Sequence, residues 1–151
     1  MMMLVLSALG LTIVTVIIHG VGTMASTGRL VRLWTRHRDP PGRLDAELLM
    51  AQVVSALLMV HLIEAIVWAL FFVLVDGLPD LETAVYFSLT SYATLGYGDV
   101  VLPEPWRLLG PIEATVGVLM LGWSTGILVA VIGAIYGQLF PSLRGHAGWR
   151  P

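Results

Sequence analysis

The chain has 151 residues, of which 57% are hydrophobic and 12% are charged, and its net charge is −2. A soluble domain of this length carries about 25% charged residues, so the composition excludes an ordinary soluble domain and indicates an integral membrane protein. The nearly neutral balance gives no support to a nucleic-acid partner, and the lack of cysteine excludes disulfides and thiolate metal sites within the chain.

The first predicted element is a transmembrane helix within residues 1–28. Residues 4–23 contain no charge and match a bilayer core, which needs about 20 apolar residues. The alternative is a secretory signal peptide, but no Lys or Arg precedes the apolar run, and arginines follow it instead. We therefore expect a retained helix, with His19 at its foot in the interfacial region.

Residues 29–45 form a predicted cytoplasmic connector, which holds most of the arginines. Its basic part, residues 29–38, is either a short amphipathic helix on the anionic inner leaflet or only the determinant of topology. The sequence DPPG at 39–42 stops regular structure. Asp45 is then the predicted N-cap of the next helix.

Two long apolar segments and a short one follow the connector. Residues 46–75 and 108–139 are each long enough to span a bilayer. Between them, residues 81–93 are too short to cross, which favours a re-entrant helix with Asp80 as its N-cap. Residues 140–151 form a short tail. The sequence therefore predicts an all-α membrane protein with three transmembrane helices and one re-entrant helix.

The distribution of charge predicts the orientation of these spans. Arginines gather in the connector and the tail, whereas residues 76–107 are rich in Asp and Glu and contain one arginine. The positive-inside rule then puts the connector and the C-terminal tail in the cytoplasm and the N-terminus outside. We expect a multi-pass protein of the cytoplasmic membrane.

The six residues TLGYGD, at 94–99, interrupt the apolar pattern with irregular backbone. Such backbone is tolerated at membrane depth only where protein buries it or where it lines a wet cavity. Gly96 and Gly98 can take positive φ without a Cβ penalty, and a strand that alternates between left- and right-handed residues turns successive carbonyls to the same side. With a short helix before it and a span on each side, this motif resembles the selectivity filter of potassium channels.

This resemblance implies a potassium-channel pore domain at 46–139, which four copies complete as a homotetramer. Its parts are an outer helix, a pore helix, a filter and an inner helix, at 46–75, 81–93, 94–99 and 108–139. Residues 1–28 are then an extra helix outside the minimal two-helix pore module, and they lack the repeated arginines of a voltage sensor.

The resemblance also implies the ion site. Backbone carbonyls and the Thr94 hydroxyl would replace the hydration shell of K⁺, and the residues concerned are Thr94, Leu95, Gly96 and Tyr97. The side chains of Leu95 and Tyr97 would pack against the pore helix, Gly98 would maintain the filter geometry, and Asp99 would lie at the outer mouth. No cofactor is implied besides the permeant K⁺, and the expected partners are K⁺, membrane lipids and the other copies.

Two positions differ from the commonest filter pattern. Leu95 stands where Val is usual, which is a mild change because its carbonyl does the coordination. Ala93 stands where a second Thr is frequent, so a ring of hydroxyls below the filter is missing.

The inner helix carries a predicted pore-lining stripe at helical spacing, formed by Val118, Leu121, Thr125, Val129 and Gly133. Gly117 matches the family's usual hinge position, and the alternative for it is close helix packing, which small residues permit in membranes. Close packing is our interpretation of the other glycines, Gly110, Gly122 and Gly137.

Three ionisable side chains fall inside the spans, at His61, Glu64 and Glu113. Such groups are costly in a membrane unless they are paired or hydrated. One interpretation is a satisfied polar network behind the filter that joins Glu64 or Glu113 to pore-helix groups such as Tyr86, Thr90, Ser91 or Tyr92. The other is proton-sensitive gating through His61 and Glu64, because the charge of His changes near physiological pH.

The expected function is passive, potassium-selective conduction. A weakly selective cation channel and a non-conducting regulatory subunit that co-assembles with other channel chains are the alternatives. No nucleophile–base set, metal cluster or phosphate-binding loop indicates an enzyme.

Overall fold

The computed structural model describes residues 1–36 and 42–139, which form four helices. They are α1 (Met2–Arg36), α2 (Arg43–Leu74), α3 (Leu81–Tyr92) and α4 (Leu109–Leu139), and there is no strand in these two ranges. The helices α1, α2 and α4 are long and apolar enough to cross a membrane. The predicted fold class, an all-α membrane protein, is confirmed.

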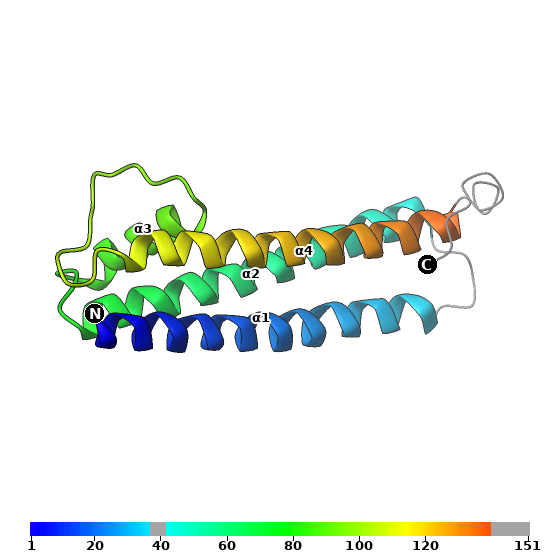
Figure 1. Ribbon diagram of the computed structural model, residues 1–151. Helices are drawn as coiled ribbons and strands as arrows, with labels where there is room; N and C mark the ends of the chain where they lie inside the picture. The colour runs from blue at the N-terminus through cyan, green and yellow to red at the C-terminus, as the bar shows by residue number, and fades with distance from the viewer. Residues whose placement is uncertain (37–41, 140–151) are drawn as a thin grey trace.

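The three long helices lie side by side along one direction, and α3 packs at one end of the bundle (Figure 1). Each of the long helices contacts the other two, whereas α3 contacts α2 and α4. The N-terminus lies at the end that carries α3 and the loop leading to α4. This arrangement brings α1, which lies outside the predicted pore domain, against α2 and α4, the two long helices of that domain.

The first helix is longer than the apolar run that predicts it. Its membrane-length part is Met2–Gly28, but the helix continues to Arg36, so the basic segment begins as a helical extension. Hydroxyls along α1 bond to carbonyls one turn earlier, for example Thr15 to Leu11 at 2.9 Å, which satisfies them in an apolar setting. Residues 37–41 of the predicted connector and the predicted tail at 140–151 lie outside the described residues.

The N-caps of α2 and α3 show one wrong and one confirmed prediction. Gly42 is the N-cap of α2, and Asp45 instead lies at the third helical position, where its Oδ2 accepts a hydrogen bond from the Gly42 N–H at 3.0 Å. Asp80 is the N-cap of α3, and its Oδ1 accepts from the Thr83 N–H at 2.8 Å. The hydrogen bonds from Thr83 lower the pKa of Asp80.

Two hydrophobic clusters of buried residues lie between the facing sides of the helices, one near the end that carries α3 and one between the first half of α2 and the last turns of α4. Trp68 and Phe72 of α2 are fully buried, and the Phe72 ring meets Phe87 of α3 edge-on at 5.4 Å. The indole N–H of Trp68 donates to the Thr15 hydroxyl at 3.0 Å, which fixes α1 against α2. Buried residues therefore position α3, and with it the loop that follows.

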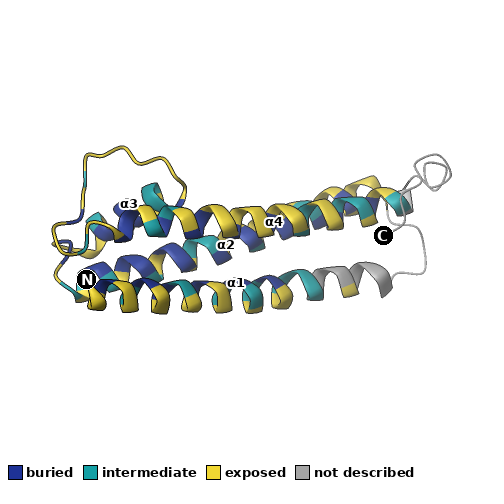
Figure 2. Cartoon of the chain, in the orientation of Figure 1, coloured by how far each residue is buried: buried dark blue, intermediate teal, exposed yellow. Residues whose placement is uncertain are grey.

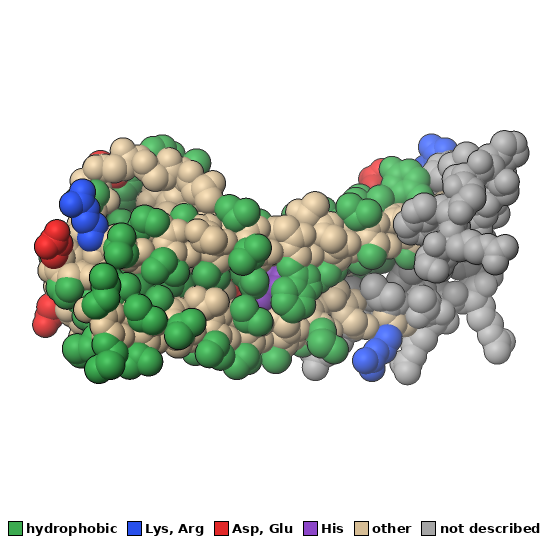
Figure 3. Space-filling view, in the orientation of Figure 1, with side chains coloured by type: hydrophobic (Ala, Val, Ile, Leu, Met, Phe, Trp, Pro, Cys, Tyr) green, Lys and Arg blue, Asp and Glu red, His purple; other side chains and the backbone are tan. Residues whose placement is uncertain are grey.

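The outward sides of the helices remain exposed within one chain (Figure 2), and many of their side chains are hydrophobic (Figure 3). An apolar surface of this extent needs a covering of lipid or protein. The chain is therefore an integral membrane protein by composition, by helix length and by surface.

Candidate functional site

The TLGYGD loop is attached to the C-terminal end of α3 by its own backbone. Beyond the C-cap Ala93, the N–H groups of Thr94 and Leu95 each donate to a carbonyl of the last helical turn, at Ser91 and Thr90 respectively, both at 2.8 Å. These bonds fix where the loop starts and the direction in which it leaves the helix.

The backbone of the loop alternates in handedness. Positive φ occurs at Thr94 (60°), Gly96 (52°) and Gly98 (77°), with Leu95 and Tyr97 between them outside that region. The predicted conformations of Gly96 and Gly98 are confirmed, whereas sequence reasoning missed Thr94, a residue type that rarely adopts φ above zero. Alternation of this kind presents consecutive carbonyls on one side of the strand.

One chain leaves this loop uncovered. Residues 93–99 are all exposed, and two large side chains in it, Leu95 and Tyr97, are 56% and 65% exposed. Beside the loop lies a cavity of about 370 Å³, lined by Thr90 of α3, Arg107 and Pro111 among others. The predicted packing of Leu95 and Tyr97 against the pore helix is thus not present within one chain.

Asp99 is held at the far end of the loop by a side chain of α3. The Tyr86 hydroxyl donates to Asp99 Oδ2 at 2.6 Å, and the Val100 N–H donates to Oδ1 at 3.0 Å. The hydrogen bond from Tyr86 lowers the pKa of Asp99. Sequence reasoning grouped Tyr86 with the buried acids, and the structure joins it to Asp99 instead.

Replacing Tyr86 by Phe should make the loop more sensitive to acid. When folding lowers the pKa of a carboxyl group, its ionised form stabilises the folded state at pH values above the ordinary pKa of about 4. This stabilisation is lost as the pH falls through the lowered pKa. Without the Tyr86 hydroxyl, the pKa of Asp99 rises and its protonation begins at a higher pH. Ion flux measured between pH 3 and 6 should therefore decline at a higher pH in Tyr86→Phe than in the original protein. If the flux of both proteins falls at the same pH, this hydrogen bond does not have the role given to it.

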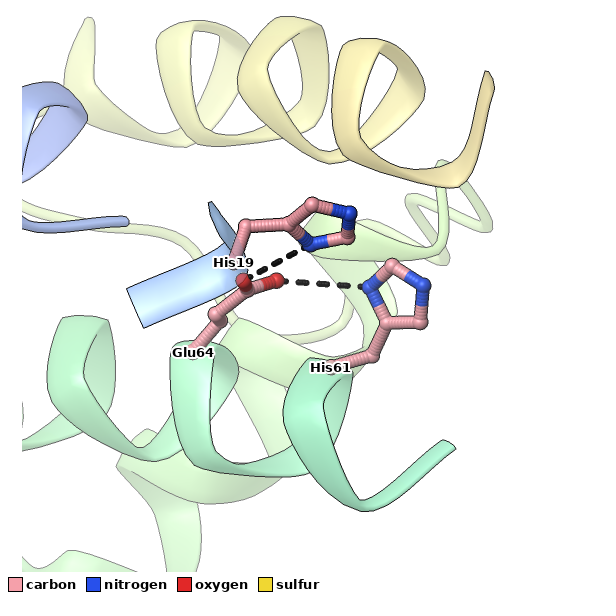
Figure 4. Close-up of side chains that lie close together, drawn as sticks. All are labelled: His19, His61 and Glu64. Atoms are coloured by element: carbon pink, nitrogen blue, oxygen red, sulfur yellow. Dashed lines mark hydrogen bonds and ion pairs between the residues drawn. The ribbon is translucent and has the colours of Figure 1, made fainter. Parts of the chain in front are cut away.

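A second polar centre is buried in the middle of the bundle, around Glu64 of α2. Glu64 Oε1 lies 2.9 Å from His19 Nδ1 of α1, and Oε2 lies 3.3 Å from His61 Nδ1. Figure 4 shows one nitrogen of each ring facing the carboxylate. The Tyr92 hydroxyl, at the end of α3, donates to Oε2 in a short hydrogen bond.

Ser124 of α4 closes this network on the opposite side of the two rings. Its Oγ lies 3.0 Å from His61 Nε2 and 3.4 Å from His19 Nε2. All four helices therefore meet in one set of hydrogen bonds that ends two residues before Thr94. The predicted link between Glu64 and Tyr92 is present in the structure, while proton-sensitive gating through His61 and Glu64 stays a prediction.

His19 was expected at the interface, and that prediction is wrong because α1 continues for more than four turns beyond it. The side chain is fully buried. A signal was present in the sequence: Thr15, His19 and Thr23 recur every four residues, which places them on one face of a helix, and all three are buried. A polar stripe on an apolar helix indicates a polar partner on the facing helix.

Glu113 of α4 has surroundings that differ from the prediction. It is fully buried near the equally buried Ser88 of α3. Among the described residues, neither carboxylate oxygen nor the Ser88 hydroxyl has a hydrogen-bond partner of good geometry. None of the four expected pore-helix partners bonds to Glu113, because α3 turns Ser88 toward it instead.

The glycines of α4 differ in what surrounds them. A Cβ built on Gly117 would lie 2.2 Å from the Tyr92 carbonyl oxygen, and one on Gly110 would lie 3.1 Å from the Phe87 ring. Gly122 has nothing within 4 Å in its own chain. Gly117 thus lets α4 pass against the C-terminal end of α3, and its action as a hinge stays a prediction.

Replacing Gly117 by Ala should therefore destabilise the protein. Overpacking of this kind costs about 1–3 kcal/mol and occasionally more, and a fixed carbonyl leaves no flexible neighbour to move. The matched control is Gly10→Ala on α1, where nothing lies within 4 Å. Thermal unfolding in detergent should show a lower midpoint for Gly117→Ala alone, and an unchanged midpoint would mean that α4 does not approach α3 this closely.

The predicted pore-lining stripe lies on a side of α4 that the chain does not cover. Val118, Leu121, Thr125 and Val129 are exposed and Gly133 is half-buried. The Thr125 hydroxyl donates to the Leu121 carbonyl of its own helix at 2.8 Å. The position of the stripe is compatible with a shared axis, and its contact with a pore stays a prediction.

One comparison with known proteins identified a family. The model of the Ion_trans_2 family, described as ion channel, matches residues 56–134, which is more than half of the chain and reaches from α2 through α3 and the TLGYGD loop into α4. No curated protein and no solved structure matched. The match does not include α1.

Proposed function

The chain belongs to the ion channel family, and we propose that four copies of it form a potassium-selective pore in which the TLGYGD loop is the filter. The carbonyls of Thr94, Leu95, Gly96 and Tyr97 replace water around K⁺. K⁺ is the permeant ion, and no cofactor takes part in conduction.

The observation that carries this proposal is the backbone of the loop. Left-handed φ at every second residue, from Thr94 to Gly98, aligns the carbonyls into one row. A single row surrounds no ion, so rings of oxygens need several copies. The exposure of Leu95 and Tyr97 and the open cavity beside them supply the surface on which a neighbouring copy packs.

The charge pattern supports an orientation in the cytoplasmic membrane. The N-terminus and the loop lie at the same end of the bundle, and that end carries Asp76, Asp80 and Asp99, while arginines cluster beyond residue 28. The positive-inside rule then places the N-terminus and the filter outside and the C-terminus in the cytoplasm.

Flux from liposomes that contain the purified protein tests the proposal. Vesicles loaded with K⁺ should release it far faster than matched vesicles loaded with Na⁺ release Na⁺. Equal rates would replace the proposal with a weakly selective cation channel. If neither ion moves at any pH tested, the chain is a regulatory subunit that needs other channel chains.

A further inference from the structure

The buried residues around Glu64 have the composition of a metal site, and no step of ion conduction needs them. We propose that His19, His61 and Glu64 bind one divalent transition-metal ion of the Zn²⁺ type, between α1 and α2 and beside the end of α3. One ligand atom from each of these three side chains lies within 4.8 Å of the others. The proposal concerns binding, so it stands whether or not the pore selects potassium.

The distances fit an ion without a rearrangement of the helices. Zn²⁺ binds nitrogen and oxygen at about 2.0–2.2 Å in a tetrahedral arrangement, which puts neighbouring ligand atoms roughly 3.3 Å apart. The separations from the Glu64 oxygens to His19 Nδ1 and to His61 Nδ1 are 2.9 and 3.3 Å. No two of the three ligand atoms are more than 4.8 Å apart. The most distant pair therefore has to approach by at most roughly 1.5 Å to bind one ion, and rotation of the two imidazole rings can bring the atoms that close.

The hydrogen bonds at Ser124 fit a metal bound at the two Nδ1 atoms. When both Nδ1 atoms donate to the acid side of the network, both Nε2 atoms need a donor, and Ser124 has one hydroxyl hydrogen. When both Nδ1 atoms bind a metal, both Nε2 atoms carry hydrogens, and the two lone pairs of Ser124 Oγ, at 3.0 and 3.4 Å, accept both. A metal-ligating His usually donates its other N–H to such an outer partner.

The Tyr92 hydroxyl lies beside these three side chains. Its hydroxyl is hydrogen-bonded to Glu64 Oε2 and lies 3.2 Å from His61 Nδ1. Two imidazoles with a carboxylate favour Zn²⁺, Co²⁺, Ni²⁺ or Cu²⁺ over Mg²⁺ and Ca²⁺, which prefer oxygen ligands only. The ring of His61 keeps 12% exposure within one chain, and Figure 3 shows a small patch of histidine surface midway along the bundle.

A metal at this position joins α1 to the pore helix. His19 contributes from α1, outside the part of the chain that matches the channel family. Tyr92 touches the site with its hydroxyl, while its carbonyl oxygen lies against Gly117 of α4. The ion therefore stabilises the assembled bundle where the loop begins.

Metal binding to the intact, tag-free protein tests the proposal. Chelator-treated protein is dialysed against Zn²⁺ in the presence of excess Mg²⁺, and its metal content is measured by mass spectrometry of the elements. We expect one Zn²⁺ and no retained Mg²⁺ per chain, together with a rise in the thermal unfolding midpoint. Co²⁺ in place of Zn²⁺ should give the visible absorption spectrum of a tetrahedral nitrogen and oxygen site.

Conservative variants assign the ligands. Ser124→Ala should weaken Zn²⁺ binding about 10–100-fold, as loss of an outer partner does, and His61→Gln and Glu64→Gln should weaken it further. Two controls should keep full binding: Thr15→Val, which removes a neighbouring buried hydrogen bond, and His37→Gln with His146→Gln, which removes the other two histidines.

The proposal is overturned if chelator-treated protein takes up no Zn²⁺, or if the amount bound is the same in His61→Gln, Glu64→Gln and the original protein. It is also overturned if Thr15→Val lowers binding as much as the ligand variants do, because the loss then reflects packing. If a ligand variant fails to assemble, the Co²⁺ spectrum of the original protein and the Ser124→Ala affinity decide the matter. Potassium flux from the same preparations reports separately on the proposed channel function.

Discussion

Gly96→Ala should abolish selective potassium flux while the protein still folds. A Cβ at Gly96 meets nothing within 4 Å, so the effect comes from its φ of 52° and not from a clash. A left-handed conformation costs an L-residue roughly 1–2 kcal/mol, and four copies in one ring would bear about four times that penalty. Relaxation of the backbone would turn carbonyls away from the ion, and liposome flux of K⁺ and Na⁺ measures the result.

Gly10→Ala is the matched control, since Gly10 is also unobstructed but lies within the helix α1. Alanine is favoured over glycine in a helix by about 0.5–1 kcal/mol, so this variant should fold and conduct normally. Circular dichroism and gel filtration establish that both variants are folded and assembled. A Gly96→Ala protein that still discriminates K⁺ from Na⁺ would show that the carbonyls of this loop do not select the ion.

His19→Leu should destabilise chelator-treated protein by about 1–3 kcal/mol, the cost of leaving a buried polar group without its hydrogen-bond partner. Glu64 is fully buried, and its carboxyl group has three close partners, of which His19 Nδ1 lies at 2.9 Å. Leucine fills the space but offers no donor, so the carboxylate loses a hydrogen bond that no water replaces. Denaturant unfolding in detergent measures the loss.

A double-mutant cycle separates the contact between His19 and Glu64 from packing. In a Glu64→Gln background the amide is a weaker hydrogen-bond acceptor than the carboxyl group, so His19→Leu should cost less than it does in the original protein. Thr15→Val, which removes the acceptor of the buried Trp68 N–H, should cost about 1–3 kcal/mol, and the same amount in either background. If the effects of His19→Leu and Glu64→Gln are simply additive, the two side chains do not interact.

The elements of the fold could be predicted from single stretches of sequence, because each depends on local composition. The lengths of the apolar segments predict the three membrane-spanning helices, and residues 81–93 are too few to cross, which predicts a helix that does not span. The cap at Asp80 and the positive φ of Gly96 and Gly98 follow from side-chain chemistry within a few residues. These are properties that a segment retains wherever it packs.

The contacts between helices could not be predicted in the same way. The pair His19 and Glu64 is 45 residues apart, and it depends on how α1 rotates against α2, which apolar periodicity leaves open when a helix is hydrophobic on all sides. The positive φ of Thr94 arises because its N–H and the next one bond back into α3. Glu113 lies near Ser88 instead of the expected partners because the rotation of α3 about its own axis decides which of its hydroxyl groups faces α4.

An X-ray structure with Rb⁺ in place of K⁺ tests the central claim most directly, because the anomalous scattering of Rb⁺ shows where the ion binds. The account predicts four chains around one axis, with a row of Rb⁺ peaks on that axis between the carbonyls of Thr94, Leu95, Gly96 and Tyr97. Chains that assemble without such an axis, or an axis without ions between these carbonyls, would contradict it.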